Sequence, residues 1–215
     1  MSNSDLLKKK KAHLEHTTAA FHGLNEKYSL LKPMLFDDNL VKKHNNYGFT
    51  VIRQSLFFNC VIDIVNIIKQ GDKRTPSIEG ISEIFLCKPT IKILHDDIVY
   101  FDAYKGIKHL EESQSIAFSK NIEKTEEDIK NILASEIYKS FVIIRDKRIA
   151  HLELKYDNDE YKLLDISTLN LEWTDLQIII DKLQAIVFNL NLILTGVNIA
   201  DRSKVNEKMK NKFWN

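Results

Sequence analysis

Apolar residues recur at three- and four-residue spacing along most of this chain, a pattern that predicts α-helices rather than strands. Proline interrupts the pattern at Pro33 and Pro89, because proline has no N–H with which to continue a helix. Residues 37–46 are expected to be a loop, and residues 106–124 a loop or a short helix. Helices are expected over residues 5–31, 46–70, 77–88 and 90–104, and from Thr125 and Thr174 onward.

The last two of these helices have clear starts. Thr125 is a good N-cap, and three acidic residues follow it, which suits the positive end of the helix dipole. The buried stripe expected for this helix consists of Ile129, Leu133, Ile137, Phe141 and Ile144. At the other start, Thr174 and Gln177 form a capping box, and Trp173 and Ile178 are expected to pack as a hydrophobic staple.

Between these two helices the pattern changes to a period of two. Residues 152–156 alternate between apolar and polar, and residues 157–159 are a turn signal. A short β-hairpin or an irregular loop is therefore expected within residues 152–166.

The composition favours one all-α helical bundle. Six glycines and three prolines leave few turns, and 215 residues suffice for a single domain with a buried core. Within this domain, residues 1–45 are expected to form an N-terminal helix and loop, residues 46–200 the core bundle, and residues 201–215 a basic tail. Cys60 and Cys87 both lie among apolar residues and are expected to be buried free thiols.

Two polar features allow two interpretations each. The basic cluster Lys8–Lys11 is either a solvated helix surface or a contact to RNA. A polar stripe on the helix over residues 46–70 either faces water or lines a cleft. The stripe consists of Ser55, Asn59, Asp63, Asn66 and Gln70.

The location expected from the sequence is the cytoplasm. A formal charge of +1 is too small for the whole protein to attract nucleic acid, so any basic surface is local. The apolar run Leu176–Val197 is long, but Asp181 and Lys182 interrupt it, which favours a buried helix over a membrane span. No apolar stretch follows the charged N-terminal residues, so no secretory signal is expected.

No metal or cofactor is expected. The chain has no phosphate-binding glycine loop, no zinc-type Cys/His spacing and no nucleophile elbow. His95-Asp96-Asp97 are adjacent and do not share a helix face, which favours a structural or solvent role. His13 and His16 have helical spacing but no third ligand nearby.

The segment Arg145-Asp146-Lys147-Arg148-Ile149-Ala150-His151 carries the main chemical signal. A guanidinium can hold a phosphate through parallel N–H bonds, and an imidazole can move a proton near neutral pH. Together they suffice to cut RNA without a metal. A structural interpretation is also open, because on an α-helix His151 continues the apolar stripe through Ile144 and could be a core histidine.

This segment resembles the signature of the HEPN superfamily, in which an arginine and a polar residue precede a histidine. Here Asp146 fills the polar position, and five residues separate Arg145 from His151. The surrounding sequence, from Ile129 to Thr195, is similar to the AbiU-like abortive-infection branch. The resemblance implies a metal-independent endoribonuclease, often a toxin or phage-defence effector, that acts as a homodimer.

The resemblance also implies roles for the residues of the segment. His151 and Arg145 would be catalytic, Asp146 would orient an arginine or the histidine, and Lys147 or Arg148 would hold flanking phosphates. Some family toxins are silenced at a tyrosine two residues after the histidine. Glu153 stands there in this chain, so any cognate antitoxin or defence-system partner is expected to act by occlusion.

The two catalytic candidates do not face each other on an ideal α-helix. Arg145 and His151 would point about 120° apart and lie about 9 Å apart along the axis, whereas Arg148 shares the face of His151. A dimer axis, or unwinding of the helix before His151, would bring them to one phosphate.

A rival hypothesis is a non-catalytic HEPN-like module that binds a nucleotide, RNA or a partner protein. In that case the apolar helices over residues 46–70 and 174–197 would serve partner contacts. A metal-dependent hydrolase is disfavoured, because the chain has no ligand cluster.

Overall fold

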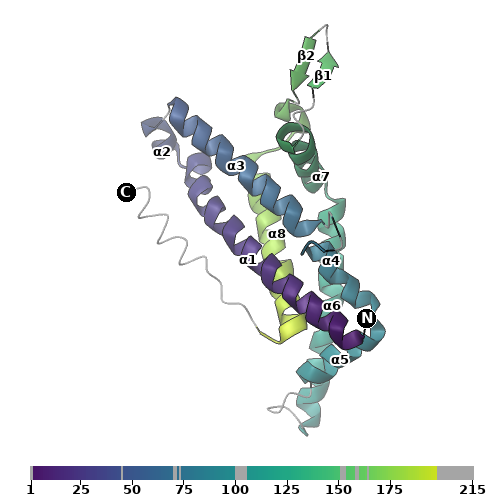
Figure 1. Ribbon diagram of the computed structural model, residues 1–215. Helices are drawn as coiled ribbons and strands as arrows, with labels where there is room; N and C mark the ends of the chain where they lie inside the picture. The colour runs from purple at the N-terminus through teal and green to yellow at the C-terminus, as the bar shows by residue number, and fades with distance from the viewer. Residues whose placement is uncertain are drawn as a thin grey trace. The chain divides into compact units, whose positions relative to one another are not determined.

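The structure is a computed structural model that describes residues 2–44, 46–69, 72, 74–99, 106–150, 154–157, 160–163 and 165–197. Helices dominate the described residues, which confirms the all-α class (Figure 1). The chain divides into two compact units. As far as they are described, unit 1 is built from residues 1–19, 67–132 and 182–200, and unit 2 from residues 20–66, 133–181 and 201–215. The assignment of residues 1–215 to one domain remains a prediction.

Eight α-helices, three short turns of other helix types and two strands make up the described chain. The α-helices are α1 (Asn3–Phe36), α2 (Asp38–Lys43), α3 (Tyr47–Ile68), α4 (Ile78–Ser82), α5 (Lys88–Val99), α6 (Lys108–Ala134), α7 (Glu136–Ile143) and α8 (Trp173–Thr195). The other elements are the 3₁₀ turns η1 (Glu83–Leu86) and η3 (Ile166–Leu169), the π-helical turn η2 (Ile144–Ala150), and the strands β1 (Leu154–Asp157) and β2 (Glu160–Leu163).

Helix α1 continues through Pro33 to Phe36, so the expected end before this proline is wrong. Pro33 removes one helical N–H, but its own carbonyl still accepts from the Asp37 N–H at 3.0 Å. Met34 is 1% exposed, and its burial stabilises this last turn. Asp37 then caps α2, so the loop expected over residues 37–46 contains a short helix.

Helix α6 begins at Lys108, so most of the stretch expected to be a loop or short helix belongs to one long helix. Thr125 is therefore not a cap. It is fully buried inside α6, and its hydroxyl donates to the Asn121 carbonyl at 2.6 Å. The true cap lies further along the chain at Ser135, whose Oγ accepts from the Tyr138 N–H at 3.3 Å and starts α7.

The break at Ser135 also changes the buried stripe. A single α-helix would have carried one face from Ile129 to Ile144, but the new start of α7 shifts the phase. Leu133 and Ile137 are only half-buried for this reason. The buried set is Ile129, Ile132, Tyr138, Phe141 and Ile144.

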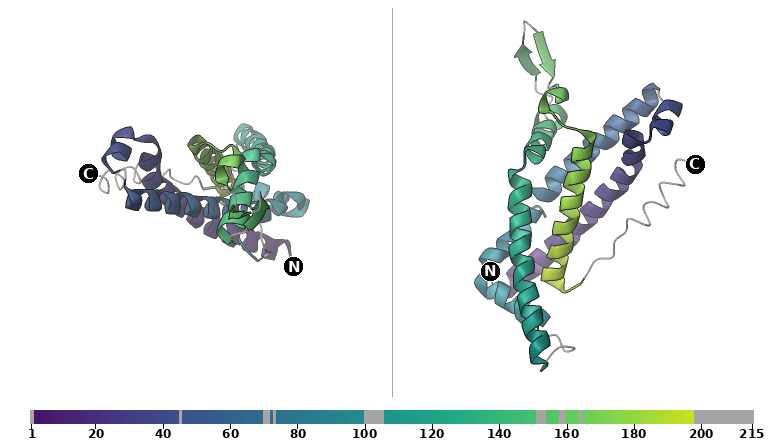
Figure 2. Two further views of the ribbon diagram at one scale, coloured as in Figure 1. Left: turned by 90° about the horizontal axis from the view of Figure 1, so that it is seen from above. Right: turned by 180° about the vertical axis from the view of Figure 1, so that it is seen from behind.

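The alternating segment forms a β-hairpin, one of the two structures expected for it (Figures 1 and 2). β1 pairs with β2 in antiparallel register, with Leu154 opposite Leu163 and Asp157 opposite Glu160. After η3, helix α8 starts one residue before the expected Thr174. Its start is stabilised by Asp175, which accepts from the Glu172 N–H at 2.8 Å, rather than by the predicted capping box.

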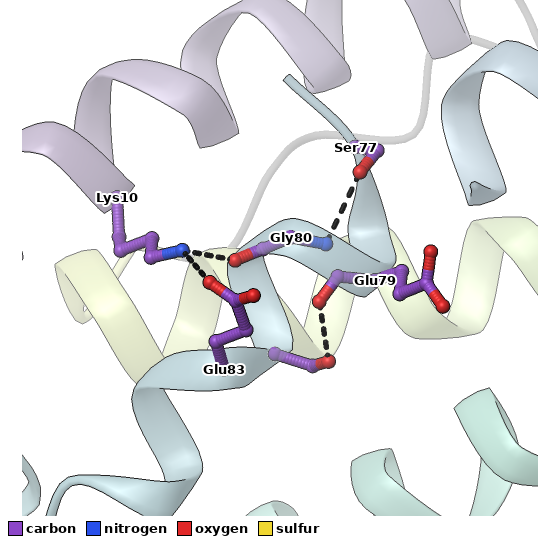
Figure 3. Close-up of polar contacts among 6 residues, drawn as sticks. Lys10, Ser77, Glu79, Gly80 and Glu83 are labelled. Atoms are coloured by element: carbon purple, nitrogen blue, oxygen red, sulfur yellow. Dashed lines mark hydrogen bonds and ion pairs between the residues drawn. The ribbon is translucent and has the colours of Figure 1, made fainter. Parts of the chain in front are cut away.

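A buried lysine links α1 to α4 and η1 within unit 1 (Figure 3). Lys10 is 5% exposed, and its Nζ donates to the Gly80 carbonyl and lies 2.8 Å from Glu83 Oε2. Ser77 caps α4 by accepting from the Gly80 N–H at 3.1 Å. Lys10 is thus a structural residue, whereas Lys8 and Lys9 of the same cluster are exposed.

We expect Lys10→Ala to lower the free energy of unfolding of the full chain by about 1–3 kcal/mol. The substitution removes the buried donor and leaves the Gly80 carbonyl and Glu83 without the ammonium. Lys8→Ala is the matched control on the exposed side of α1, where a change within about 0.5 kcal/mol is expected. Urea denaturation followed by circular dichroism measures both, and equal effects would contradict the structural role of Lys10.

Polar contacts made by α1 and α3 hold the elements of unit 2 together. Lys27 Nζ lies 2.6 Å from Asp63 Oδ2, and the Tyr28 hydroxyl donates to Gln177 Oε1 at 2.7 Å. The rings of Phe57 and Trp173 meet edge to face at 5.3 Å between centroids. Trp173 therefore packs on α3, and Gln177 bonds to α1 instead of capping α8.

The polar stripe of α3 faces water in the part that is described. Ser55, Asn59 and Asn66 are exposed, and Asp63 is half-buried in its ion pair with Lys27. Helices α3 and α8 are each long and apolar enough to cross a membrane by length and composition, a test that the core helix of a soluble protein also passes. Both helices also carry fully buried residues, such as Ile64 on α3 and Leu183 on α8.

The two thiols differ in burial. Cys60 is fully buried, and burial raises its pKa to about 12, with the Asp63 carboxylate adding to the shift. Cys87 is only half-buried, so the expectation of burial is wrong for this thiol. Its pKa is lowered from 9.0 by the Thr90 hydroxyl, 3.0 Å away, and by the Thr90 backbone N–H.

Alkylation with iodoacetamide at neutral pH should therefore modify Cys87 and spare Cys60 in the folded protein. The thiolate is the reactive form, and both burial and the raised pKa make it scarce at Cys60. We expect Cys60 to react more than about a hundredfold more slowly than Cys87. Peptide mass spectrometry over time measures both rates, with urea-unfolded protein as the control in which both thiols react.

Candidate functional site

The segment singled out in the sequence lies at the end of α7, where the helix widens. Residues Ile144–Ala150 form the π-helical turn η2, with hydrogen bonds from i to i+5 in place of i to i+4. The α-helical geometry assumed for Arg145 and His151 therefore does not apply to this turn. Such turns are rare, and they occur frequently at functional sites.

The apolar stripe of α7 ends where η2 begins. Ile144 is fully buried. Four residues of the turn are half-buried, namely Arg145, Asp146, Arg148 and Ile149, and Lys147 is exposed. The alternative of a core histidine assumed that this stripe continues on an α-helix beyond Ile144. It stays an alternative prediction, because His151 lies outside the described residues.

Arg145 and Asp146 are joined in the structure. Arg145 Nε donates to Asp146 Oδ1 at 2.7 Å, and Nη2 lies 2.6 Å from the same oxygen. The Arg145 side chain is 27% exposed and that of Asp146 43%. One carboxylate oxygen of Asp146 contacts both Nε and Nη2 of Arg145, so it orients the planar guanidinium. The N–H donors on Nη1 are not used by this contact.

The other two cations of the segment differ in their surroundings. Lys147 is exposed. Arg148 is half-buried, and its charge helps to lower the pKa of Asp165, an effect that follows those of the hydrogen bonds from Ser167. The Ser167 backbone N–H donates to Asp165 Oδ1 at 3.0 Å. The charge of Arg148 therefore influences Asp165, whereas Asp146 is paired with Arg145.

Asp165 was not identified as part of this region from the sequence. Its place two residues before Ser167 signals a local Asx-type cap, which the structure contains. The nearness of its charge to Arg148 is a tertiary feature, for which the sequence has no signal. His151 lies outside the described residues, and the roles assigned to the five residues of the segment remain predictions.

Two other histidines, His95 and His13, lie outside this segment. His95 Nε2 lies 2.9 Å from Ser115 Oγ, Nδ1 lies 3.2 Å from Asp96 Oδ1, and the ring meets Phe118 edge to face. The pKa of His13 is lowered by burial and then by the nearby cations of α1. Within the described ranges, no three His, Cys, Asp or Glu side chains are grouped so that they could hold a metal ion.

Comparison with protein families gives a match over residues 5–204 to the model described as AbiU2, a HEPN family. The chain belongs to this family. The match extends well beyond the segment Ile129–Thr195 that resembled it in sequence. It runs from the first turn of α1 past the end of α8 and includes the whole of Arg145–His151. This AbiU2 chain is thus an abortive-infection HEPN-type module. No curated protein and no solved structure matches it significantly.

The AbiU2 segment has the chemistry of a phosphate-binding turn. An arginine whose side chain is held by a carboxylate presents its remaining N–H donors in a fixed direction, which favours a bound phosphate group. The exposed Lys147 adds a second cation on the same turn. The arrangement can bind and stabilise a phosphate, and a histidine that follows the turn would add proton transfer.

Proposed function

We propose that this AbiU2 protein is a metal-independent endoribonuclease of a toxin or phage-defence system. The observation that carries the proposal is the orientation of Arg145 by Asp146 inside a π-helical turn of the HEPN motif. Membership of the family supports it. An oriented guanidinium can stabilise negative charge that develops during a reaction. In phosphodiester cleavage this charge develops on the phosphoryl oxygens.

The proposed reaction is attack by a ribose 2′-hydroxyl on the adjacent phosphorus. His151 takes the hydroxyl proton, or supplies one to the leaving 5′-oxygen. The new bond joins the 2′-oxygen to phosphorus, and the bond from phosphorus to the 5′-oxygen breaks. Arg145 stabilises the extra negative charge on the phosphoryl oxygens during the attack. The products are a 2′,3′-cyclic phosphate and a 5′-hydroxyl, and the step needs neither water nor a metal.

Lys147 and Arg148 are the candidates for flanking phosphates, the role assigned to them from the sequence. Lys147 is exposed and Arg148 is half-buried on the same turn. A cation there can attract a phosphate of the RNA strand beside the one that is cleaved.

The proposed active form is a homodimer in the cytoplasm. Two copies of the segment around one two-fold axis would supply cations and histidines to one RNA strand. An antitoxin or defence-system partner would act by covering this surface, because Glu153 replaces the tyrosine that is modified in some family members.

Incubation of the purified protein with total RNA in EDTA tests the proposal. Cleavage with 2′,3′-cyclic phosphate ends is expected, because the mechanism uses no metal. Cleavage that appears only when Mg²⁺ is added would contradict it. RNA that stays intact with folded, dimeric protein would favour the non-catalytic binding module instead. Size-exclusion chromatography of the same sample tests the homodimer separately.

A further inference from the structure

A groove between α5 and α6 in unit 1 has no part in the proposed reaction. It has a volume of about 300 Å³, and its apolar lining includes Phe85 of η1, Ile91 of α5 and Ile122 of α6. These three residues are half-buried, so each keeps part of its surface accessible. The volume lies at the lower end of the range for small-molecule sites, and it suffices for one apolar side chain of a partner.

Apolar surface continues next to the groove. Leu86 follows Phe85 in the chain and is 82% exposed. A single exposed leucine needs no explanation by itself, but beside an apolar groove it enlarges the surface that a partner can bury. A protein segment gains more from such a surface than a small molecule does, because it can cover the groove and the leucine together.

Two lysines of α5 give the groove a positive charge. Lys88 and Lys92 lie four residues apart, so they share one face of the helix, and both are exposed. Neither of them forms an ion pair in the part of the chain that the structure describes. Among the described residues that line the groove, none is acidic. Asp96 lies one turn further along α5 and contacts His95 Nδ1 at 3.2 Å. The groove therefore attracts a negatively charged ligand.

Two other cavities of unit 1 lack this combination. One measures about 430 Å³ and is lined by Glu111 and Glu112, whose charges would repel an anion. The other lies along a single face of α1, where Glu15 accompanies Lys8 and Lys11. Of these three sites, only the α5–α6 groove joins an apolar lining to lysines without an acidic residue.

We propose that the α5–α6 groove binds an acidic segment of a partner protein. One apolar side chain of the segment lies in the groove against Phe85 and Ile91. Aspartate or glutamate residues beside it in the segment pair with Lys88 and Lys92. The apolar anchor supplies most of the affinity, because contacts buried at the centre of an interface dominate its free energy. The carboxylates supply charge complementarity, which selects the partner and speeds its association.

The charge and the lining of the groove favour this occupant over two others. Residues 201–215 of this chain carry five Lys or Arg against two acidic residues, so the lysines of the groove repel this segment. Phe118 is 5% exposed and packs edge to face on His95, so it offers no ring face on which an RNA base could stack. An acidic segment with an apolar anchor matches both the charge and the shape. The proposal does not depend on nuclease activity.

Selection from a random peptide display library on the purified full chain tests the proposal. The expected result is an enriched pattern in which Leu, Ile or Phe stands beside Asp or Glu. The enriched peptide is then labelled with a fluorophore and titrated by anisotropy, and its binding should weaken as the salt concentration rises, because exposed charges are screened. No enrichment, or enrichment of peptides without acidic residues, would contradict the proposal.

The double variant Lys88→Glu/Lys92→Glu locates the site. It should weaken binding of the enriched peptide by about tenfold or more, because two attractions become repulsions. Lys42→Glu/Lys43→Glu reverses the same charges at two exposed positions of α2 and should leave binding unchanged. Circular dichroism checks that both variants are folded. The proposal is overturned if both variants bind like the wild type, or if both lose affinity equally.

The apolar half of the site has its own test. Leu86→Ser should weaken binding by about threefold or more, because the exposed leucine is expected to be buried under the peptide. Saturating peptide should also slow alkylation of Cys87, which stands between Leu86 and Lys88. If neither effect appears, the peptide binds elsewhere and the proposal fails. It also fails if Lys88→Glu/Lys92→Glu without peptide changes the oligomeric state in size-exclusion chromatography, because a second copy would then cover the groove.

Discussion

His151→Ala should lower the rate of RNA cleavage by about 10²–10⁴, the usual contribution of a general acid or base. The imidazole is the only group of the motif that can exchange a proton near neutral pH, since arginine and lysine stay protonated there. The measurement is single-turnover cleavage of a labelled RNA in EDTA. RNA binding, measured by fluorescence anisotropy, should change little.

His16→Ala is the matched control for this variant. His16 is exposed on α1 and is assigned no part in the reaction, so wild-type cleavage is expected. Equal rates for wild type, His16→Ala and His151→Ala would remove His151 from the mechanism. Equal loss in both variants would point to a general effect on the protein rather than to proton transfer.

Arg145→Ala should lower cleavage by about 10²–10³, the effect of removing one donor that stabilises developing charge. Arg145→Lys should restore little of this activity. A lysine supplies the charge but not the planar fork that Asp146 orients through two nitrogens. The loss should appear mainly in kcat, measured with saturating RNA, because the charge on the phosphoryl oxygens increases in the transition state.

Arg74→Ala is the control for the removal of an arginine. Arg74 forms a similar pair with its neighbour Asp72, at 2.8 Å, but its side chain is 88% exposed, and no role in the site is assigned to it. Cleavage should be unchanged.

Asp146→Asn adds a graded test, since the amide keeps one acceptor oxygen but weakens the hold on Arg145. A loss smaller than that of Arg145→Ala is expected, and full activity would show that orientation of the guanidinium is unimportant.

The contact between Arg145 and Asp146 has a second consequence for binding. Of the three cations of the segment, Arg145 is paired with Asp146, and the charge of Arg148 helps to lower the pKa of Asp165. In the proposed mechanism the segment therefore holds phosphate by the direction of its donors more than by net charge. This agrees with the formal charge of +1, which gives the whole chain no general attraction for nucleic acid.

Several elements could be predicted from the sequence because their causes are local. The apolar period of α3 predicted a helix, and the alternation of residues 152–156 with the turn signal after it predicted a hairpin or a loop. The helix and the hairpin are present. Local periodicity was sufficient for these elements. The site residues Arg145 and His151, which stand at the spacing of the HEPN motif, remain a prediction.

Helix boundaries failed where a local signal competed with burial. Thr125 looks like a cap, but its buried position in α6 satisfies its hydroxyl through Asn121. Pro33 looks like a stop, yet α1 continues through it because Met34 is buried in the same turn. In both cases the stabilisation from packing exceeds the local preference, which amounts to about 1–3 kcal/mol.

The sequence by itself determined the helical class of this protein, its place in the AbiU2 family and the chemical groups of its motif. Only the tertiary structure decided that Arg145 lies in a π-helical turn, that Asp146 holds the guanidinium, and that Asp165 lies near Arg148. The physical reason is the range of the interactions involved. Helical periodicity is a property of neighbouring residues, whereas the widening of a turn and the pairing of its charges depend on side chains that packing brings together.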